Sequence, residues 1–116
     1  VSLVETYVKA SLCGEKGEHV FEKILVTTDS ILTVIPKDVC DKAGVYMTPL
    51  KIDVKLKDGT VKEAKVGIAL LIIKDKCAPV QVASLEDAEP VVGAHALELL
   101  GFRINPATGE VEERQT

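Results

Sequence analysis

The residues best placed for acid–base chemistry form a short polar turn, Thr27–Ser30, directly after the apolar run Ile24–Val26. Asp29 supplies the only carboxylate in this turn, and a positioned carboxylate can act as a general acid or base. The hydroxyl group of Thr27 cannot replace it near neutral pH, because a hydroxyl proton is not acidic enough to be lost. A second interpretation is an ordinary polar turn with Asx-type hydrogen bonds at Asp29.

Other reactive side chains lack the spacing of a known kind of site. Cys13, Cys40 and Cys77 form no CxxC pair and have no His at ligand spacing, which argues against a zinc site and a disulfide framework. We interpret them as small core residues. The acidic stretch 86–89 lacks the alternating oxygen ligands and the glycine of a calcium site. We therefore expect neither a metal nor another cofactor.

The two histidines carry weaker signals. His95 follows Gly93-Ala94 at the start of an expected helix. It could donate a proton near a groove, although a structural role is the favoured interpretation. His19 stands at the beginning of an expected strand with no partner nearby in the sequence, and we expect it on the surface.

Composition narrows the class of protein. A chain of 116 residues with 47% hydrophobic residues suits one domain with its own core. The 14 basic and 18 acidic residues give a net charge of -4 without a Lys/Arg cluster, so we expect no nucleic-acid partner. The longest apolar stretch, Ile68–Ile73, is too short to span a bilayer. Together with the odd number of cysteines, these features predict a cytoplasmic protein without a membrane partner.

Alternation with a period of two dominates the first part of the chain and predicts β-strands. From position 4 to position 12 the even residues suit a core face, while Glu5, Lys9 and Ser11 suit a solvent face. A turn at 14–18 then leads into a returning strand over His19–Val26.

A second alternating run places Leu50, Ile52, Val54 and Leu56 on one face of a strand. It ends at Asp58-Gly59, a strong signal for a tight hairpin, because glycine tolerates the positive φ that such turns need. Further strands are expected over Val61–Ile73 and, after Pro79, over Val80–Leu85.

Two short segments are typical of helices. The first begins at Pro36 and ends at Gly44, which is the usual asymmetry of helix ends. The second, Ala94–Leu100, is rich in Ala and Leu and ends at Gly101.

The end of the chain is predicted to contain a turn over 105–109 and a last edge strand over Glu110–Glu112. No repeat, low-complexity segment or linker interrupts the sequence. One mostly β domain over residues 1–116 is the simplest interpretation.

Four features follow one another in a fixed order along the chain. They are the apolar strand Ile24–Val26, the turn Thr27–Ser30, the run Leu32–Pro36 before a helix, and Val91–Gly93 before a second helix. With the Asp58-Gly59 hairpin between them, this layout resembles the retropepsin-like (retroviral-type) aspartic peptidases, in particular their small prokaryotic members. The resemblance covers roughly residues 3–112. It implies an all-β, closed barrel with one or two short helices, pairing as a two-fold homodimer.

In that family, an apolar strand delivers an Asp-Thr/Ser-Gly triplet at a tight turn, and two chains each supply one aspartate to a shared site. Carboxylates about 3 Å apart share one proton, so that one activates water while the other polarises the scissile carbonyl. The resemblance assigns four residues to peptide binding. Asp58 and Gly59 would form a flap over the peptide, and Val92 and Gly93 would pack under the site.

The triplet itself departs from the family pattern. Counted back from Leu32–Pro36, the family's Asp falls on Thr27, its Thr on Thr28 and its Gly on Asp29. Asp29 could act as a displaced catalytic acid, although a shift of two residues moves a side chain by several ångströms from the aligned position. The favoured interpretation is a peptidase with a disabled site that keeps its peptide groove.

We therefore expect an aspartic-peptidase-like protein that is impaired in peptide hydrolysis. Two alternatives stay open: a non-catalytic peptide- or protein-binding dimer that uses the same groove, and a purely structural dimer. The expected partners are a second copy of the chain and a peptide or protein.

Overall fold

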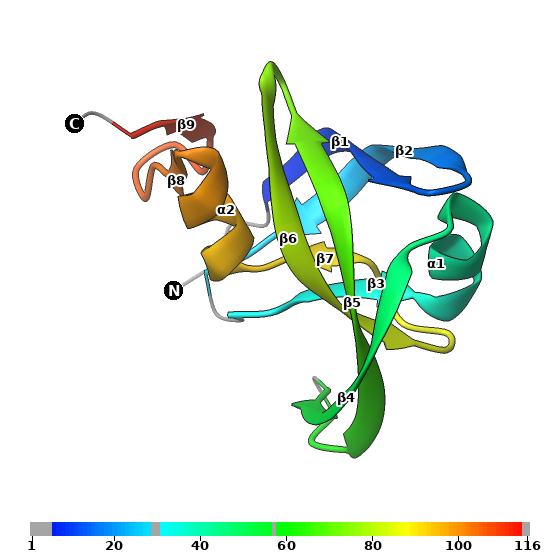
Figure 1. Ribbon diagram of the computed structural model, residues 1–116. Helices are drawn as coiled ribbons and strands as arrows, with labels where there is room; N and C mark the ends of the chain where they lie inside the picture. The colour runs from blue at the N-terminus through cyan, green and yellow to red at the C-terminus, as the bar shows by residue number, and fades with distance from the viewer. Residues whose placement is uncertain (1–5, 29–30, 57, 115–116) are drawn as a thin grey trace.

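The computed structural model describes residues 6–28, 31–56 and 58–114 of the chain. These residues form a mostly β structure with two short helices (Figure 1). In chain order the elements are β1 (Thr6–Gly14), β2 (Gly17–Val26), β3 (Thr33–Pro36), α1 (Lys37–Ala43), β4 (Tyr46–Lys55), β5 (Val61–Ile73), β6 (Lys76–Leu85), β7 (Val91–Val92), α2 (Ala94–Leu100), β8 (Phe102–Ile104) and β9 (Val111–Glu113).

Seven of the strands form one mixed sheet in the order β1-β2-β7-β3-β6-β5-β4. The sheet closes on itself because β1 also pairs antiparallel with β5, from Ala10 opposite Ile73 to Cys13 opposite Leu70. The ring is not a regular barrel, since β7 has only two residues and meets β3 at a single pair, Val34 and Val91. The prediction of a mostly β fold is confirmed, and the expected closed barrel is instead an irregular ring.

The core fills the inside of this ring. On β1, Ala10 and Leu12 are 2% and 0% exposed and alternate with more exposed neighbours, as the period-two pattern predicts. Residues from every side of the ring and from both helices join the same cluster, among them Ile24, Ile35, Val39, Leu71, Ile73, Val82, Leu97 and Phe102.

Strands β4 and β5 form a long hairpin whose outer part projects from the ring (Figure 1). A second, smaller core cluster, Val54, Ala64, Ala83 and Leu85, packs between this outer part and β6. Leu50, predicted on the same face as Ile52 and Val54, is 62% exposed. The reason is a shift in the β4–β5 register between Met47 and Lys51, a stretch that contains Pro49, whose ring nitrogen cannot donate a ladder hydrogen bond.

Strand β6 begins at Lys76, earlier than the predicted start at Val80, and therefore contains Pro79. Proline is tolerated there because β6 has a paired neighbour on one side only at this point: Pro79 lies opposite Leu70 of β5, whereas pairing with β3 starts at Val82.

Both predicted helices are confirmed, and each ends at a glycine in the left-handed conformation, Gly44 with φ 73° and Gly101 with φ 80°. The last strand, predicted over Glu110–Glu112, lies one residue later as β9 and pairs with β8 in a separate two-stranded sheet. Within the described ranges, neither helix is long and apolar enough to cross a membrane.

Candidate functional site

The polar turn with the predicted chemistry begins where β2 ends. Strand β2 runs parallel to β7, with Val26 opposite Val92. The backbone N–H of Thr27 donates to the Val92 carbonyl at 3.0 Å. Thr27 is half-buried and Thr28 is exposed. The structure thus brings Thr27 and Val92 together, and β7 fixes the point at which the chain leaves the sheet.

Asp29, the only carboxylate of the turn, lies outside the described residues, as does Ser30. The described chain resumes at Ile31, whose side chain is 72% exposed. The Ile31 carbonyl accepts the backbone N–H of His95 at 3.3 Å. Both ends of the turn are therefore bound to the segment that runs from β7 into α2.

Beneath the turn, a buried hydrogen bond joins β3 to the same segment. The Gly93 N–H donates to the Thr33 hydroxyl at 3.1 Å, and Thr33 is only 1% exposed. A Cβ atom at Gly93 would lie 2.4 Å from the Leu32 carbonyl oxygen and 2.6 Å from that of Ile31. Only glycine lets the two backbones approach this closely. We call this contact the Thr33–Gly93 crossing.

Val92 and Gly93 were predicted for this region from the sequence, whereas Thr33 was not. The sequence contains a feature that could have identified Thr33. It is the one polar residue in the apolar run 31–35, and a buried hydroxyl needs a hydrogen-bond partner. The exposed His95 lines a hollow of about 250 Å³ with Ile31, Gln81 and others. Of these residues, only His95 was considered from the sequence as a possible proton donor.

Asp58 and Gly59 form the tip of the β4–β5 hairpin. The Thr60 N–H donates to Asp58 Oδ1 at 2.9 Å, and the Gly59 N–H donates to the Leu56 carbonyl at 2.9 Å. The Thr60 N–H holds the pKa of Asp58 below its ordinary value, with smaller contributions from the Thr60 hydroxyl and Lys62. Gly59 has φ +88°, as the hairpin signal predicts. These hydrogen bonds stay within the tip, so they do not connect Asp58 and Gly59 to the turn at Thr27.

No protein-family model and no curated protein matches the chain. The chemistry open to this site follows from the side chains that form it. The hydroxyl groups of Thr27 and Thr28 can donate and accept hydrogen bonds, but they cannot take over the proton transfers of a carboxylate at neutral pH. Asp29 is therefore the one residue of the turn whose side chain suits acid–base chemistry.

The cysteines differ in burial. Cys40 is buried, Cys13 is half-buried and Cys77 is exposed, so the prediction of core residues is confirmed for Cys40 and wrong for Cys77, which belongs to the exposed positions of β6. Burial raises the pKa of the Cys40 thiol. Burial and the neighbouring Glu18 raise that of Cys13. Both are protonated thiols at neutral pH and poor nucleophiles.

Metal ligands do not gather anywhere in the described part of the chain. No group of three or more His, Cys, Asp or Glu side chains in residues 6–28, 31–56 and 58–114 could hold a metal ion.

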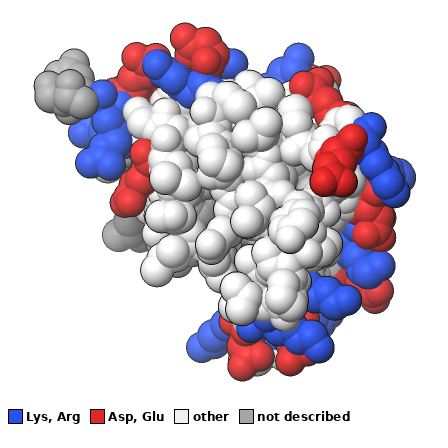
Figure 2. All heavy atoms as spheres, in the orientation of Figure 1, with Lys and Arg blue, Asp and Glu red and all other residues white. Residues whose placement is uncertain are grey.

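Charged side chains are distributed unevenly over the surface. Figure 2 shows a broad face over β5, β6 and α2 that lacks Lys, Arg, Asp and Glu, surrounded by charges of both signs. The large apolar side chains exposed on these elements and on β4 include Tyr46, Ile68, Leu70 and Leu99. This face combines exposed apolar side chains with a lack of charged ones.

Proposed function

We propose that the chain is one subunit of an aspartic-peptidase-like dimer that binds peptides at a site shared by two copies and is impaired in cutting them. The retropepsin-like fold and the two-fold pairing are parts of this proposal. Its main support is the Thr33–Gly93 crossing, because a buried hydrogen bond and a close backbone contact there hold the segment after the turn. The Thr27–Val92 hydrogen bond holds the segment before it. A turn held in this way can present side chains of two chains to one substrate with little reorganisation.

The impairment follows from the side chain at position 27. A dyad of acids works because one carboxylate is charged and activates water while its partner is protonated. A pair of threonine hydroxyls cannot share a proton in this way, since neither loses its own near neutral pH. The turn therefore keeps hydrogen-bonding groups for a peptide, and water attack on the scissile carbonyl is not activated.

The surface supports pairing with a second copy. Ile31 is 72% exposed directly beside the turn, and a large apolar side chain at such a point gains free energy when a partner covers it. The uncharged face over β5, β6 and α2 adds exposed apolar area on the same chain (Figure 2). A second subunit that meets the turn would bury Ile31 and bring two copies of Thr27 near each other.

The hairpin supports the peptide-binding part of the proposal. Its tip is ordered by its own hydrogen bonds from Gly59 and Thr60, and the small Val54 cluster is the apolar packing that attaches its outer part to the ring. Limited packing of this kind lets a hairpin change position over a bound peptide without unfolding the ring.

Cleavage of an unfolded, reduced protein tests the impairment. Wild type and the variant Asp29→Asn are each incubated with this substrate at about pH 4 to 5, where a shared-proton dyad is competent. We expect neither protein to cleave above the background without enzyme. Cleavage by wild type that disappears in Asp29→Asn would show that Asp29 is a displaced catalytic acid, and the impairment would be wrong.

Sedimentation of the full chain tests the shared site. We expect a dimer at micromolar concentration, and a weaker dimer for Ile31→Ser. A wild-type chain that sediments as a monomer would contradict a site built from two copies. A dimer that binds an unfolded peptide but cuts nothing in any variant would instead favour the alternative, a non-catalytic peptide- or protein-binding dimer that uses the same groove.

A further inference from the structure

A row of polar side chains crosses three neighbouring strands. Lys51 of β4 lies opposite Lys65 of β5, which lies opposite Ser84 of β6. Residues directly opposite each other in a sheet share a face. Ser84 in turn lies opposite Ile35 of β3, two residues before the start of α1 at Lys37. The polar row ends at Ser84, because Ile35 is buried in the core, and Lys37 at the start of α1 lines the same hollow beside the row.

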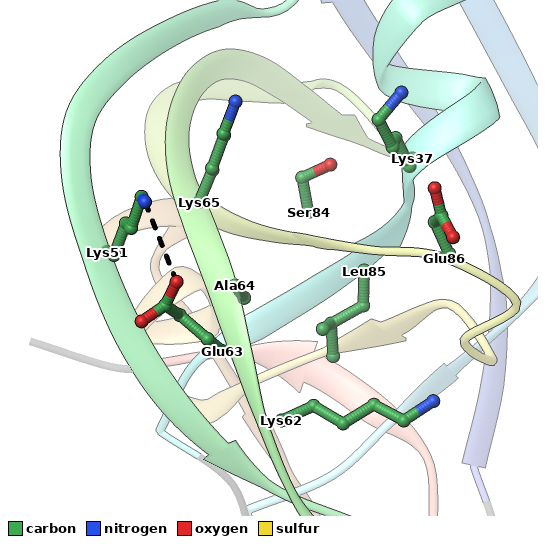
Figure 3. A pocket seen from close by; sticks show the side chains of 9 residues that line it. All are labelled: Lys37, Lys51, Lys62, Glu63, Ala64, Lys65, Ser84, Leu85 and Glu86. Atoms are coloured by element: carbon green, nitrogen blue, oxygen red, sulfur yellow. Dashed lines mark ion pairs between the residues drawn. The ribbon is translucent and has the colours of Figure 1, made fainter.

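These side chains line a hollow of about 340 Å³ between the hairpin and the body of the protein (Figure 3). In Figure 3 the ammonium groups of Lys65 and Lys37 point to the same side of the hollow, with the Ser84 hydroxyl between them. The apolar chain of Leu85 forms part of its wall. The three polar groups thus come from β5, β6 and α1.

The charges around the hollow are incompletely balanced. Lys51 pairs with Glu63 at 3.6 Å, and Lys37 pairs with Asp41 at 3.2 Å. The side chains of both pairs are more than half exposed, so solvent screens them and an incoming anion can displace them at little cost. Lys65 has no ion pair within the described part of the chain.

The position of Lys65 opposite Lys51 is electrostatically unfavourable. Two lysines directly opposite each other on one face of a sheet repel, which costs stability. The chain as a whole carries a net charge of -4, so these lysines are not part of a generally basic surface. Local rules that favour stability are broken mainly where a site needs the offending residue.

We propose that this hollow binds a small molecule through its phosphate group. Lys65 and Lys37 donate charge-assisted hydrogen bonds to the phosphate oxygens. The Ser84 hydroxyl, which bonds to the Cys40 thiol in this structure, turns to donate a third. The hollow is larger than a phosphate group alone and is of the size of small-ligand sites, so the rest of the molecule occupies the remaining space beside Leu85. Glu86, which also lines the hollow, disfavours a second phosphate.

A phosphate at this place also connects two parts of the fold. Lys65 belongs to the hairpin and Lys37 to α1, so one ligand that contacts both restrains the hairpin against the body. This inference does not depend on peptide binding or cleavage.

Isothermal titration tests the site in the full chain at constant ionic strength. The probes are inorganic phosphate and glycerol phosphate, and the variants are Lys65→Gln, Lys37→Gln and Lys23→Gln. Lys23 is an exposed lysine of β2 outside the hollow, which makes it the matched control. We expect saturable one-to-one binding that weakens about tenfold in each of the first two variants and stays unchanged in the control.

The two probes separate the possible sources of the phosphate group. Tighter binding of glycerol phosphate than of inorganic phosphate supports a small-molecule ligand, and equal affinities would overturn that assignment in favour of the free ion. Binding that is not saturable, or that weakens as much in Lys23→Gln as in Lys65→Gln, would overturn the site altogether.

Thermal unfolding without phosphate provides a second readout. Because Lys65→Gln removes the repulsion from Lys51, we expect it to raise the melting temperature by a few degrees while it weakens phosphate binding. A lower melting temperature combined with unchanged phosphate affinity would contradict the proposal.

Discussion

The segments around the turn and the outer part of the β4–β5 hairpin are built in opposite ways. Around the turn, a buried hydrogen bond between Thr33 and Gly93 joins elements 60 residues apart in the sequence. At the hairpin tip, the hydrogen bonds that Asp58, Gly59 and Thr60 form with described residues all lie within residues 56–60. The first region depends on tertiary packing, and the second is largely a local structure.

This difference in contacts determines which of the two regions can move. A region tied by long-range buried contacts opens only when much of the protein unfolds, whereas a hairpin held by local bonds and a small cluster opens at low cost. Fixed segments beside the turn and a hairpin that opens at low cost are consistent with the peptide-binding site that we propose. Substitutions in each region test this difference.

The largest effect is expected for Gly93→Ala. The new methyl group would lie 2.4 Å from the Leu32 carbonyl oxygen, so backbone must shift, and we expect a loss of about 3 kcal/mol in the free energy of unfolding. Urea denaturation measures it. The matched control is Gly59→Ala at the hairpin tip, where a methyl group meets nothing within 4 Å but φ is +88°, for a loss of about 1 kcal/mol. Equal losses at the two glycines would contradict the comparison.

A smaller loss is expected for Thr33→Val. This change keeps the shape of the side chain but leaves the buried Gly93 N–H without its acceptor, which costs about 1 to 3 kcal/mol in the free energy of unfolding. Thr48→Val is the control, since the Thr48 hydroxyl donates to the Val66 carbonyl at 2.7 Å in a less buried place. If the Thr48 variant lost as much stability as the Thr33 variant in the same urea titration, the special importance of the buried Thr33–Gly93 hydrogen bond would be contradicted.

The smallest effect is expected for Asp58→Asn and concerns acid stability. Because the folded pKa of Asp58 is below its ordinary value of about 3.9, the carboxylate adds stability that is present above that value. This stability is lost as the pH falls through the lower folded pKa. Asparagine keeps the Asx turn without the charge, so the variant should lose stability less steeply than wild type below about pH 4.

Melting curves of both proteins at several acid pH values measure this difference. Near neutral pH the two should differ little, since the tip is exposed. An identical acid dependence would show that the Thr60 N–H does not stabilise the charged form.

The sequence predicted those parts of the fold that depend on local signals. Pro36 and Gly44 delimit α1, Gly101 ends α2, and Asp58-Gly59 makes the hairpin, because each of these residues restricts or frees its own backbone. β8 was not predicted, since a strand of three residues gives too little alternation to detect.

The features that depend on contacts between distant residues could not be predicted from local sequence signals. The start of β6 was predicted late because Pro79 argues against a strand unless one knows that β3 does not yet pair there. In the candidate site, Val92 and Gly93 were selected by resemblance, whereas Thr33 and the row from Lys51 to Ser84 meet their neighbours only across strands. The pairing of strands distant in sequence, which brings these groups together, is set by the whole core.

Restoring the triplet tests whether the chain is, as we propose, a peptidase frame that lacks its acid. The double variant Thr27→Asp with Asp29→Gly places a carboxylate at the end of β2 and a glycine two residues later. Cleavage of an unfolded, reduced protein is measured at about pH 4 to 5, with Asp29→Gly alone as the control. We expect the double variant to cleave the substrate and the control not to cleave it. A folded, dimeric double variant without cleavage would contradict this proposal.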